Sequence, residues 1–192
     1  MKADEIVKKI LSGLEKNDGC RRKHANFWNF VEKSVKESGI ADQACYEISN
    51  IYESELISWG PAENDPPDVE FNFKNGQTVA VEITELVNQN AIEIQIKNPE
   101  RYSDELFRFD YPVAVEELNR ILVEKEEKMR SVESLYSESI LLIHTDEFLL
   151  DSDLFIGKES EIFKRSSEVF KHAFLLFSYE PLKKCCPILK LL

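Results

Sequence analysis

Two acidic residues in the segment 66–86, "PPDVEFNFKNGQTVAVEITEL", have the type and spacing that metal chemistry requires. Asp68 follows a pair of prolines, and Glu82 stands near the end of a run rich in β-branched residues, two positions before Thr84. Carboxylate oxygens are the ligands that hard cations such as Mg²⁺ and Mn²⁺ prefer in proteins. A site exists only if the elements that carry Asp68 and Glu82 bring their side chains together.

The sequence "KNGQ" lies between two alternating runs and therefore predicts a β-hairpin. A two-residue turn at Asn75-Gly76 would place Asp68 opposite Ile83 and would mix apolar and acidic side chains on each face. A three-residue loop over residues 74–76, with Gly76 in the left-handed conformation, separates them instead. The apolar face then consists of Val69, Phe71, Phe73, Val79, Val81 and Ile83. We therefore expect the second register, in which Asp68 lies directly opposite Glu82.

Two neighbouring carboxylates on one sheet face repel each other unless a proton or a cation lies between them. One interpretation is a solvated sheet face with acids at its edge, which is common in an acidic protein. The other is a hard-cation site, in which Mg²⁺ or Mn²⁺ is held by few carboxylates and keeps several waters for substrate oxygens. Geometry within the hairpin leaves both interpretations open.

The first sixty residues have apolar side chains at helical spacing and predict three helices. The second helix is expected to end at residues 37–39, "ESG", and the third to begin with Asp42 as its N-cap and to extend to Leu56. Residues 59–67 predict a loop by composition. The apolar stripes of these helices consist of Ile6, Ile10 and Leu14, then Phe27, Phe30, Val31 and Val35, then Ala44, Ile48, Ile51 and Leu56.

The remaining chain predicts strands that alternate with helices. Pro112 suits the first turn of a long helix that carries Val115, Leu118, Ile121 and Leu122. Residues 139–147 and 173–181 are expected to be buried strands, residues 160–172 a helix, and residues 185–192 an edge strand that tolerates Pro187. The predicted fold class is α/β (α+β), a mixed β-sheet flanked by helices, within a single domain of residues 1–192.

Composition sets limits on the class of protein. The 192 residues are 43% hydrophobic and 31% charged, which indicates a globular, water-soluble chain without a membrane-spanning segment. Residues 1–17 predict an amphipathic helix and not a signal peptide. Cys20, Cys45, Cys185 and Cys186 lack metal-site spacing, so we expect reduced thiols in a cytoplasmic protein. A net charge of −12 argues against broad affinity for nucleic acid, which depends on lysine and arginine.

The motifs "PPD" and "VAVEIT" resemble the metal-binding core of the PD-(D/E)xK nuclease superfamily. The order of segments from Tyr46 to the C-terminus resembles an uncharacterised branch whose second motif reads E-x-T-E-L. The resemblance implies a restriction-endonuclease-like core over residues 41–192 with an N-terminal helical extension over residues 1–40. It also implies Mg²⁺ or Mn²⁺ as cofactor, with Asp68, Glu82 and the Ile83 carbonyl as metal ligands, and DNA or RNA as substrate.

Thr84 departs from this pattern, because the superfamily usually has a lysine there that orients the attacking water and offsets charge on the phosphate. Lys125 and Lys128 lie three residues apart on the helix after the hairpin and share a face, so either is a candidate for a displaced lysine. Lys97 is a third candidate. The alternative for these lysines is a solvated helix face. The superfamily often adds a glutamate from the preceding helix, and Glu32 and Glu47 both qualify.

Other polar residues form weaker patterns. His144 and Asp146 end a buried strand, whereas His24 and His172 belong to no ligand motif. Residues 21–24, "RRKH", are the only dense basic cluster. Two functions remain: a metal-dependent phosphodiester hydrolase, and a catalytically inactive nuclease-fold protein that binds a basic protein, as an acidic immunity or antitoxin-like partner does. Thr84 and the net charge favour the second, and the paired carboxylates favour the first.

Overall fold

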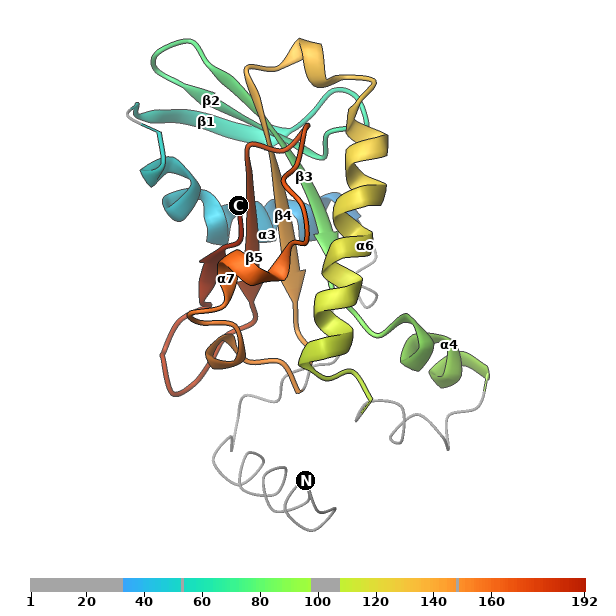
Figure 1. The fold of residues 1–192 in the computed structure, drawn as a ribbon. Coiled ribbons are helices and arrows are strands. Elements are labelled where there is room, and N and C mark those ends of the chain that lie inside the picture. The colour runs from blue at the N-terminus through green and yellow to red at the C-terminus, as the bar shows by residue number, and fades with distance from the viewer. Residues whose placement is uncertain (1–32, 53, 98–107, 148) are drawn as a thin grey trace.

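The computed structural model describes residues 33–52, 54–97, 108–147 and 149–192. Its centre is a mixed six-stranded sheet in the order β1-β2-β3-β4-β5-β6 (Figure 1). Neighbours β3, β4 and β5 run parallel, and the other pairs are antiparallel. The predicted mixed sheet flanked by helices is confirmed. The strands are β1 Leu56–Pro61, β2 Val69–Phe73, β3 Thr78–Glu85, β4 Glu138–Thr145, β5 His172–Phe177 and β6 Ile188–Lys190.

Helices cover both faces of the sheet (Figure 1). Helix α3 (Lys33–Asn50) packs Ala41, Ala44 and Ile48 against one face. The opposite face is covered by α6 (Tyr111–Met129) and the short α7 (Glu159–Ile162). A further helix, α4 (Gln89–Lys97), follows β3, and 3₁₀ turns occupy Glu133–Leu135 and Ser152–Leu154. Each sheet face therefore has its own apolar core. Among the described residues, no helix is both long and apolar enough to cross a membrane.

The hairpin has the expected register. Val69 pairs with Val81 and Phe71 with Val79, and the Phe73 N–H donates to the Gln77 carbonyl over 2.9 Å to close the loop. Gly76 adopts φ +85°, the left-handed conformation that glycine tolerates best. The six apolar side chains of the predicted face, from Val69 to Ile83, all belong to the core under α3, whereas Ala80 lies on the opposite face. Burial of one face thus selected the register, as the alternation of the sequence predicts.

Helix α6 begins and packs as its sequence predicts. The Asp110 side chain accepts a hydrogen bond from the Val113 N–H over 3.3 Å, and Pro112 lies in the first turn. Leu118, Ile121 and Leu122 are buried against the sheet. Strands β4 and β5 are buried on both faces, as predicted. The edge strand predicted over residues 185–192 is present as β6, but it spans only Ile188–Lys190 and begins after Pro187.

The predicted break at residues 37–39 is wrong. Helix α3 continues through Gly39, and Asp42 lies exposed in its middle instead of capping a new helix. Burial of the apolar residues that follow Gly39, from Ile40 to Ile48, favours the helix and outweighs the roughly 1 kcal/mol that a helical glycine costs, whereas Val35 before it is exposed. The helix also runs through residue 40, where the N-terminal extension was expected to end.

The predicted helix up to Leu56 is also wrong, because Leu56–Pro61 forms strand β1. The loop predicted over residues 59–67 is confirmed for residues 62–67 only. This strand pairs with β2, for example Trp59 with Phe71. Backbone pairing with a neighbour created the strand, and the local composition does not reveal it. Pro61 is tolerated because β1 is an edge strand.

Only the start of the helix predicted over residues 160–172 exists. After Ile162 the chain is irregular, and Ser167 Oγ accepts the N–H groups of Val169 and Phe170 over 3.2 and 2.7 Å. Such local bonds compete with helical ones. Side chains of α6 also hold this segment, because Asn119 accepts from the Lys164 N–H and buried Glu126 pairs with Arg165. Helix α4 was not predicted; the Asn88 side chain caps it by accepting from the Ala91 N–H over 3.0 Å.

Candidate metal site

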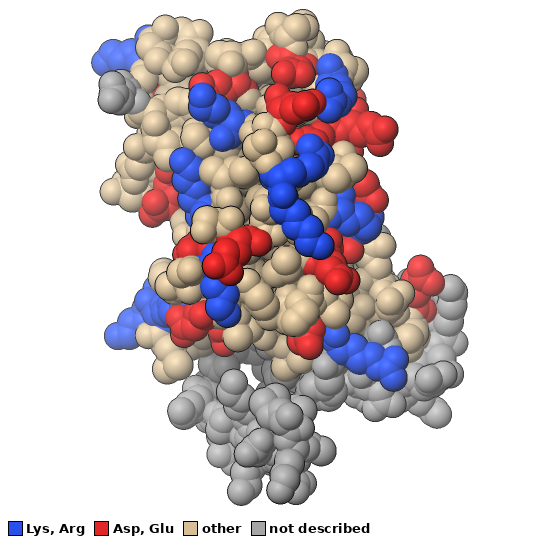
Figure 2. Space-filling model, in the orientation of Figure 1, with Lys and Arg blue, Asp and Glu red and all other residues tan. Residues whose placement is uncertain are grey.

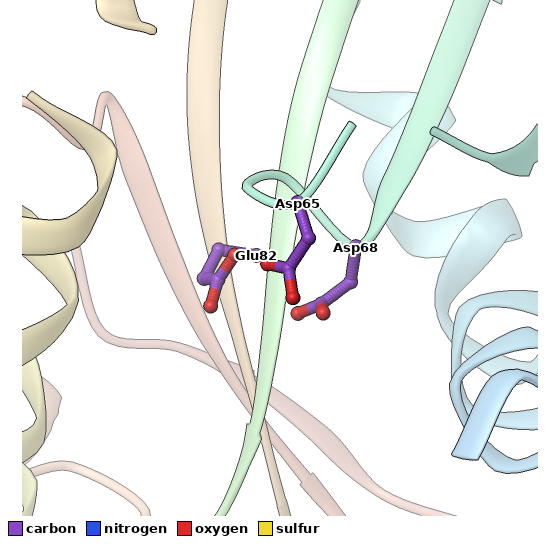
Figure 3. A group of neighbouring side chains, drawn as sticks. All are labelled: Asp65, Asp68 and Glu82. Atoms are coloured by element: carbon purple, nitrogen blue, oxygen red, sulfur yellow. The ribbon is translucent and has the colours of Figure 1, made fainter. Parts of the chain in front are cut away.

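Three carboxylates gather beside β3 on the face that α6 covers (Figure 3). Asp65 lies in the loop between β1 and β2, Asp68 directly precedes β2, and Glu82 lies on β3. One carboxylate oxygen from each lies within 4.8 Å of the others. Continuing the hairpin register by one residue places Asp68 opposite Glu82, so the predicted pairing of these two acids is present. Asp65 was not predicted.

A backbone hydrogen bond orients Asp68. Its Oδ2 accepts from the Ile83 N–H over 2.7 Å, and its side chain is buried. Strand β2 begins only at Val69, because the preceding chain turns away through Pro66 and Pro67. The Asp68 carboxylate therefore takes the place of a strand partner for the Ile83 N–H, which a buried backbone donor needs. The Asp68 carboxylate is thus anchored to the backbone of β3.

Glu82 is fully buried and receives two ammonium groups from α6. Its Oε1 lies 2.6 Å from Lys125 Nζ and 2.8 Å from Lys128 Nζ. Lys125 Nζ also lies 3.4 Å from the Ile83 carbonyl oxygen, and Lys128 Nζ lies 2.6 Å from Asp65 Oδ1. Without a metal, these ammonium groups are the cations that offset the repulsion between the acids.

The three carboxylates raise the pKa of Lys128. Its partial burial lowers the pKa, but hydrogen bonds to Asp65 and Glu82 and the charges of Glu82 and Asp68 outweigh that effect. Lys128 is therefore held in its charged form. Three negative and two positive charges give the cluster a formal charge of −1.

The donor atoms fit a hard divalent cation. All three side chains offer carboxylate oxygens, which Mg²⁺ and Mn²⁺ prefer. Glu82 Oε2 is buried and has no hydrogen-bond partner among the residues that the structure describes. A buried, unpaired carboxylate oxygen costs free energy, and a bound cation would remove that cost. Asp68 and Glu82 are thus able to hold the metal.

The structure separates the candidate residues into two groups. Lys125 and Lys128 both reach the carboxylates, whereas Thr84 is half-buried on β3 two residues beyond Glu82. Glu47 is exposed on α3, which covers the opposite face of the sheet, so it does not contribute to the cluster. Glu32 and the Lys97 side chain lie outside the described part of the chain.

The weaker candidates lie elsewhere. His144 Nε2 is 3.4 Å from Ser178 Oγ at the end of β4, and Asp146 is buried close by. Burial lowers the pKa of His172, and the charge of Lys190 adds to this effect. Cys45 and Cys186 are half-buried, and Cys185 is exposed. His24, Cys20 and the basic cluster 21–24 lie outside the described residues.

Asp65 is the residue that reasoning from the hairpin missed. It lies in a loop, where no alternation of side chains assigns it to a face. The available signal was proximity, because "DPPD" separates Asp65 from Asp68 by two prolines only. Comparison of the chain with family models, curated proteins and solved structures gave no match. The properties of the site therefore follow from its own geometry.

Proposed function

We propose that the protein is a metal-dependent phosphodiester hydrolase, a nuclease-like enzyme that uses Mg²⁺ or Mn²⁺. Asp68, Glu82 and the Ile83 carbonyl would hold the metal, as the resemblance to the PD-(D/E)xK superfamily implies. The observation that carries the proposal is the Lys125 ammonium group, which lies 2.6 Å from Glu82 Oε1 and 3.4 Å from the Ile83 oxygen. Helix α6 thus supplies a cation beside the acids although position 84 is a threonine.

Each side chain has a distinct role in this proposal. When bound, a divalent cation polarises a phosphodiester and lowers the pKa of an attacking water. Lys125 donates to a phosphate oxygen and offsets the negative charge that develops there, which is most effective where burial excludes water. Asp68 keeps its orientation through the Ile83 N–H. Thr84 contributes no charge, and we assign it no more than a hydroxyl at the edge of the site.

The surface charge bears on how a nucleic acid would bind. On the face shown in Figure 2, basic and acidic side chains are interspersed. With a net charge of −12, the chain attracts a polyanion weakly. We therefore propose local recognition, in which binding depends on a few phosphates close to the site and not on a long basic surface.

The direct test is cleavage of single-stranded and double-stranded DNA and RNA over a range of Mn²⁺ concentrations. Replacing Lys125 with methionine keeps the packing of its stem and removes the charge. We expect Lys125→Met to lower the Mn²⁺-dependent cleavage rate by about 100-fold or more. The matched control is Lys74→Met. Lys74 lies in the hairpin loop and forms an exposed ion pair with Glu55, so its replacement should leave the cleavage rate unchanged. Absence of cleavage by the wild type on all four substrates would refute the enzyme.

The second candidate is a catalytically inactive protein that binds a basic protein partner. Two observations favour it: the net charge of −12 and the threonine at the position of the usual lysine. In that case Lys125 and Lys128 serve only to neutralise buried acids. Association with a basic protein that weakens steeply with salt, together with no cleavage of nucleic acid, would support this function.

A further inference from the structure

The formal charge of the cluster around Glu82 changes sign when a divalent cation is added. Three carboxylates and two ammonium groups give a formal charge of −1. Adding a divalent cation to these side chains would give +1. Both lysines already contact Glu82 Oε1, and Lys128 also contacts Asp65 Oδ1, so a cation bound by Asp65 and Glu82 would compete with the ammonium groups for the charge of the same two carboxylates.

We infer that Asp65 is a third carboxylate of the cation site, and that Lys128 is an internal counter-ion that occupies this position until a divalent cation displaces it. This inference rests on the proposed function, because it adds a ligand to the same metal site. The resemblance to the nuclease superfamily does not supply it. That resemblance implies a glutamate from the preceding helix, whereas Glu47 lies on the far side of the sheet and Asp65 comes from a loop.

The contacts distinguish the two lysines. Within the described part of the chain, the Lys125 ammonium group forms its hydrogen bonds with β3 alone, to the Glu82 carboxylate and the Ile83 carbonyl, and its side chain is 22% exposed. The Lys128 ammonium group contacts Glu82 on β3 and Asp65 in the loop between β1 and β2. The Lys128 side chain is 33% exposed, and that of Asp65 is 63% exposed. Lys128 can therefore leave the acids for solvent with little rearrangement. The less exposed Lys125 would have to break its hydrogen bonds with both Glu82 and Ile83 of β3 to do so.

Displacement gives Lys128 a second role. After exchange, the cation with Asp65, Asp68 and Glu82 carries a formal charge of −1, and the two ammonium groups bring the total to +1. A phosphodiester carries one negative charge and would neutralise this total. The lysine released by the metal is then free to contact a phosphate next to the scissile one, so that metal binding prepares the site for a polyanion.

The test measures Mn²⁺ affinity alone, by electron paramagnetic resonance of free Mn²⁺, with no substrate present. We expect Asp65→Asn to bind Mn²⁺ about tenfold more weakly than the wild type, because a charged ligand is lost. We expect Lys128→Met to bind it more tightly, because the competitor is removed. The controls are Glu55→Gln and Lys74→Met, which alter an exposed ion pair elsewhere and should match the wild type.

The double variant Asp65→Asn/Lys128→Met shows whether Asp65 binds the cation or only forms an ion pair with Lys128. If Asp65 binds the cation, the double variant should bind Mn²⁺ about tenfold more weakly than Lys128→Met. If Asp65 only holds Lys128, the two should be equal, and the inference is overturned. Asp68→Asn tests the metal site on which the proposed function depends. If neither the wild type nor Lys128→Met binds Mn²⁺, or if Asp68→Asn binds it as the wild type does, the metal site fails and this inference fails with it.

Discussion

At the scale of single residues, the central feature is one buried carboxylate shared by two lysines. Glu82 has no solvent exposure, and a buried carboxylate without a counter-charge is strongly destabilising. Either lysine alone can neutralise it, because both contact the same Oε1 atom. The two contributions to stability should therefore be interdependent.

We accordingly expect non-additive effects in metal-free buffer. Lys125→Met and Lys128→Met should each lower the free energy of unfolding by at most about 1 kcal/mol, because the other lysine remains. The double variant should lose about 3–5 kcal/mol, the cost of an unpaired buried charge. Urea denaturation of the four proteins measures this coupling. Additive losses would show that Glu82 is not shared in solution.

The Lys125→Met/Lys128→Met double variant also tests whether a divalent cation binds to these acids. In the double variant Glu82 has lost both ammonium groups, so Mn²⁺ should restore more stability to it than to the wild type. The measurement is the shift in melting temperature on adding Mn²⁺. The control is Mn²⁺ added to the double variant that also carries Asp68→Asn, which should respond less. An equal response of wild type and double variant would argue against a metal held by these acids.

At the scale of elements, the turn between β2 and β3 determines whether the acids meet. Its loop depends on the left-handed conformation of Gly76, and the space around its missing Cβ is open. Gly76→Ala should therefore destabilise the protein by about 1–2 kcal/mol through backbone strain alone. Gly60→Ala is the matched control, because Gly60 in β1 also has open space but no positive φ, and its effect should be small. Comparable losses for both variants in urea denaturation would contradict this explanation.

Glu147, which follows β4 and contacts the start of α4, is a buried acid that makes the stability of the protein depend on pH. Burial raises the pKa of Glu147 to about 7, and the charge of Asp146 adds to this, although a hydrogen bond from the Asn88 N–H opposes it. A folded-state pKa above the unfolded value means that the folded protein binds more protons between these values. Stability from this group is therefore greatest at low pH and falls as pH rises from about 4.5 to about 7.

Glu147→Gln should remove that loss. The amide oxygen can still accept from the Asn88 N–H, and the side chain no longer ionises. We expect the variant to be more stable than the wild type by roughly 3 kcal/mol at pH 8, with the difference shrinking toward pH 5. Urea denaturation across this range measures the difference. Parallel pH profiles for the two proteins would show that Glu147 ionises as easily in the folded state as in the unfolded one.

At the scale of the whole molecule, the net charge of −12 limits contact with nucleic acid. If two lysines supply the phosphate contacts, the logarithm of the binding constant should fall with the logarithm of salt concentration with a slope of about −2. Lys128→Met should reduce that slope by about 1. Fluorescence anisotropy of a labelled oligonucleotide, in the presence of non-catalytic Ca²⁺, measures both values. A much steeper slope would place most of the binding outside the described site.

The sequence alone determined those features that depend on local pattern. Alternation in the hairpin has only one register that buries all its apolar side chains, so the pairing of Asp68 with Glu82 was predictable. The long helix with Lys125 and Lys128 on one face was equally predictable from its proline and its apolar stripe. The buried strands β4 and β5 followed from uninterrupted apolar runs.

Only the tertiary structure decided the features that depend on distant partners. Strand β1 exists because β2 offers it a backbone edge, and α3 continues through Gly39 because the sheet buries the apolar residues from Ile40 to Ile48 that follow it. The segment after Ile162 is held by side chains of α6 and not by its own helix propensity. Asp65 joins the acids because its loop turns back over β3, and Lys125 stands in reach of Glu82 because α6 crosses that face. These contacts join residues far apart in the chain, and no local pattern encodes them.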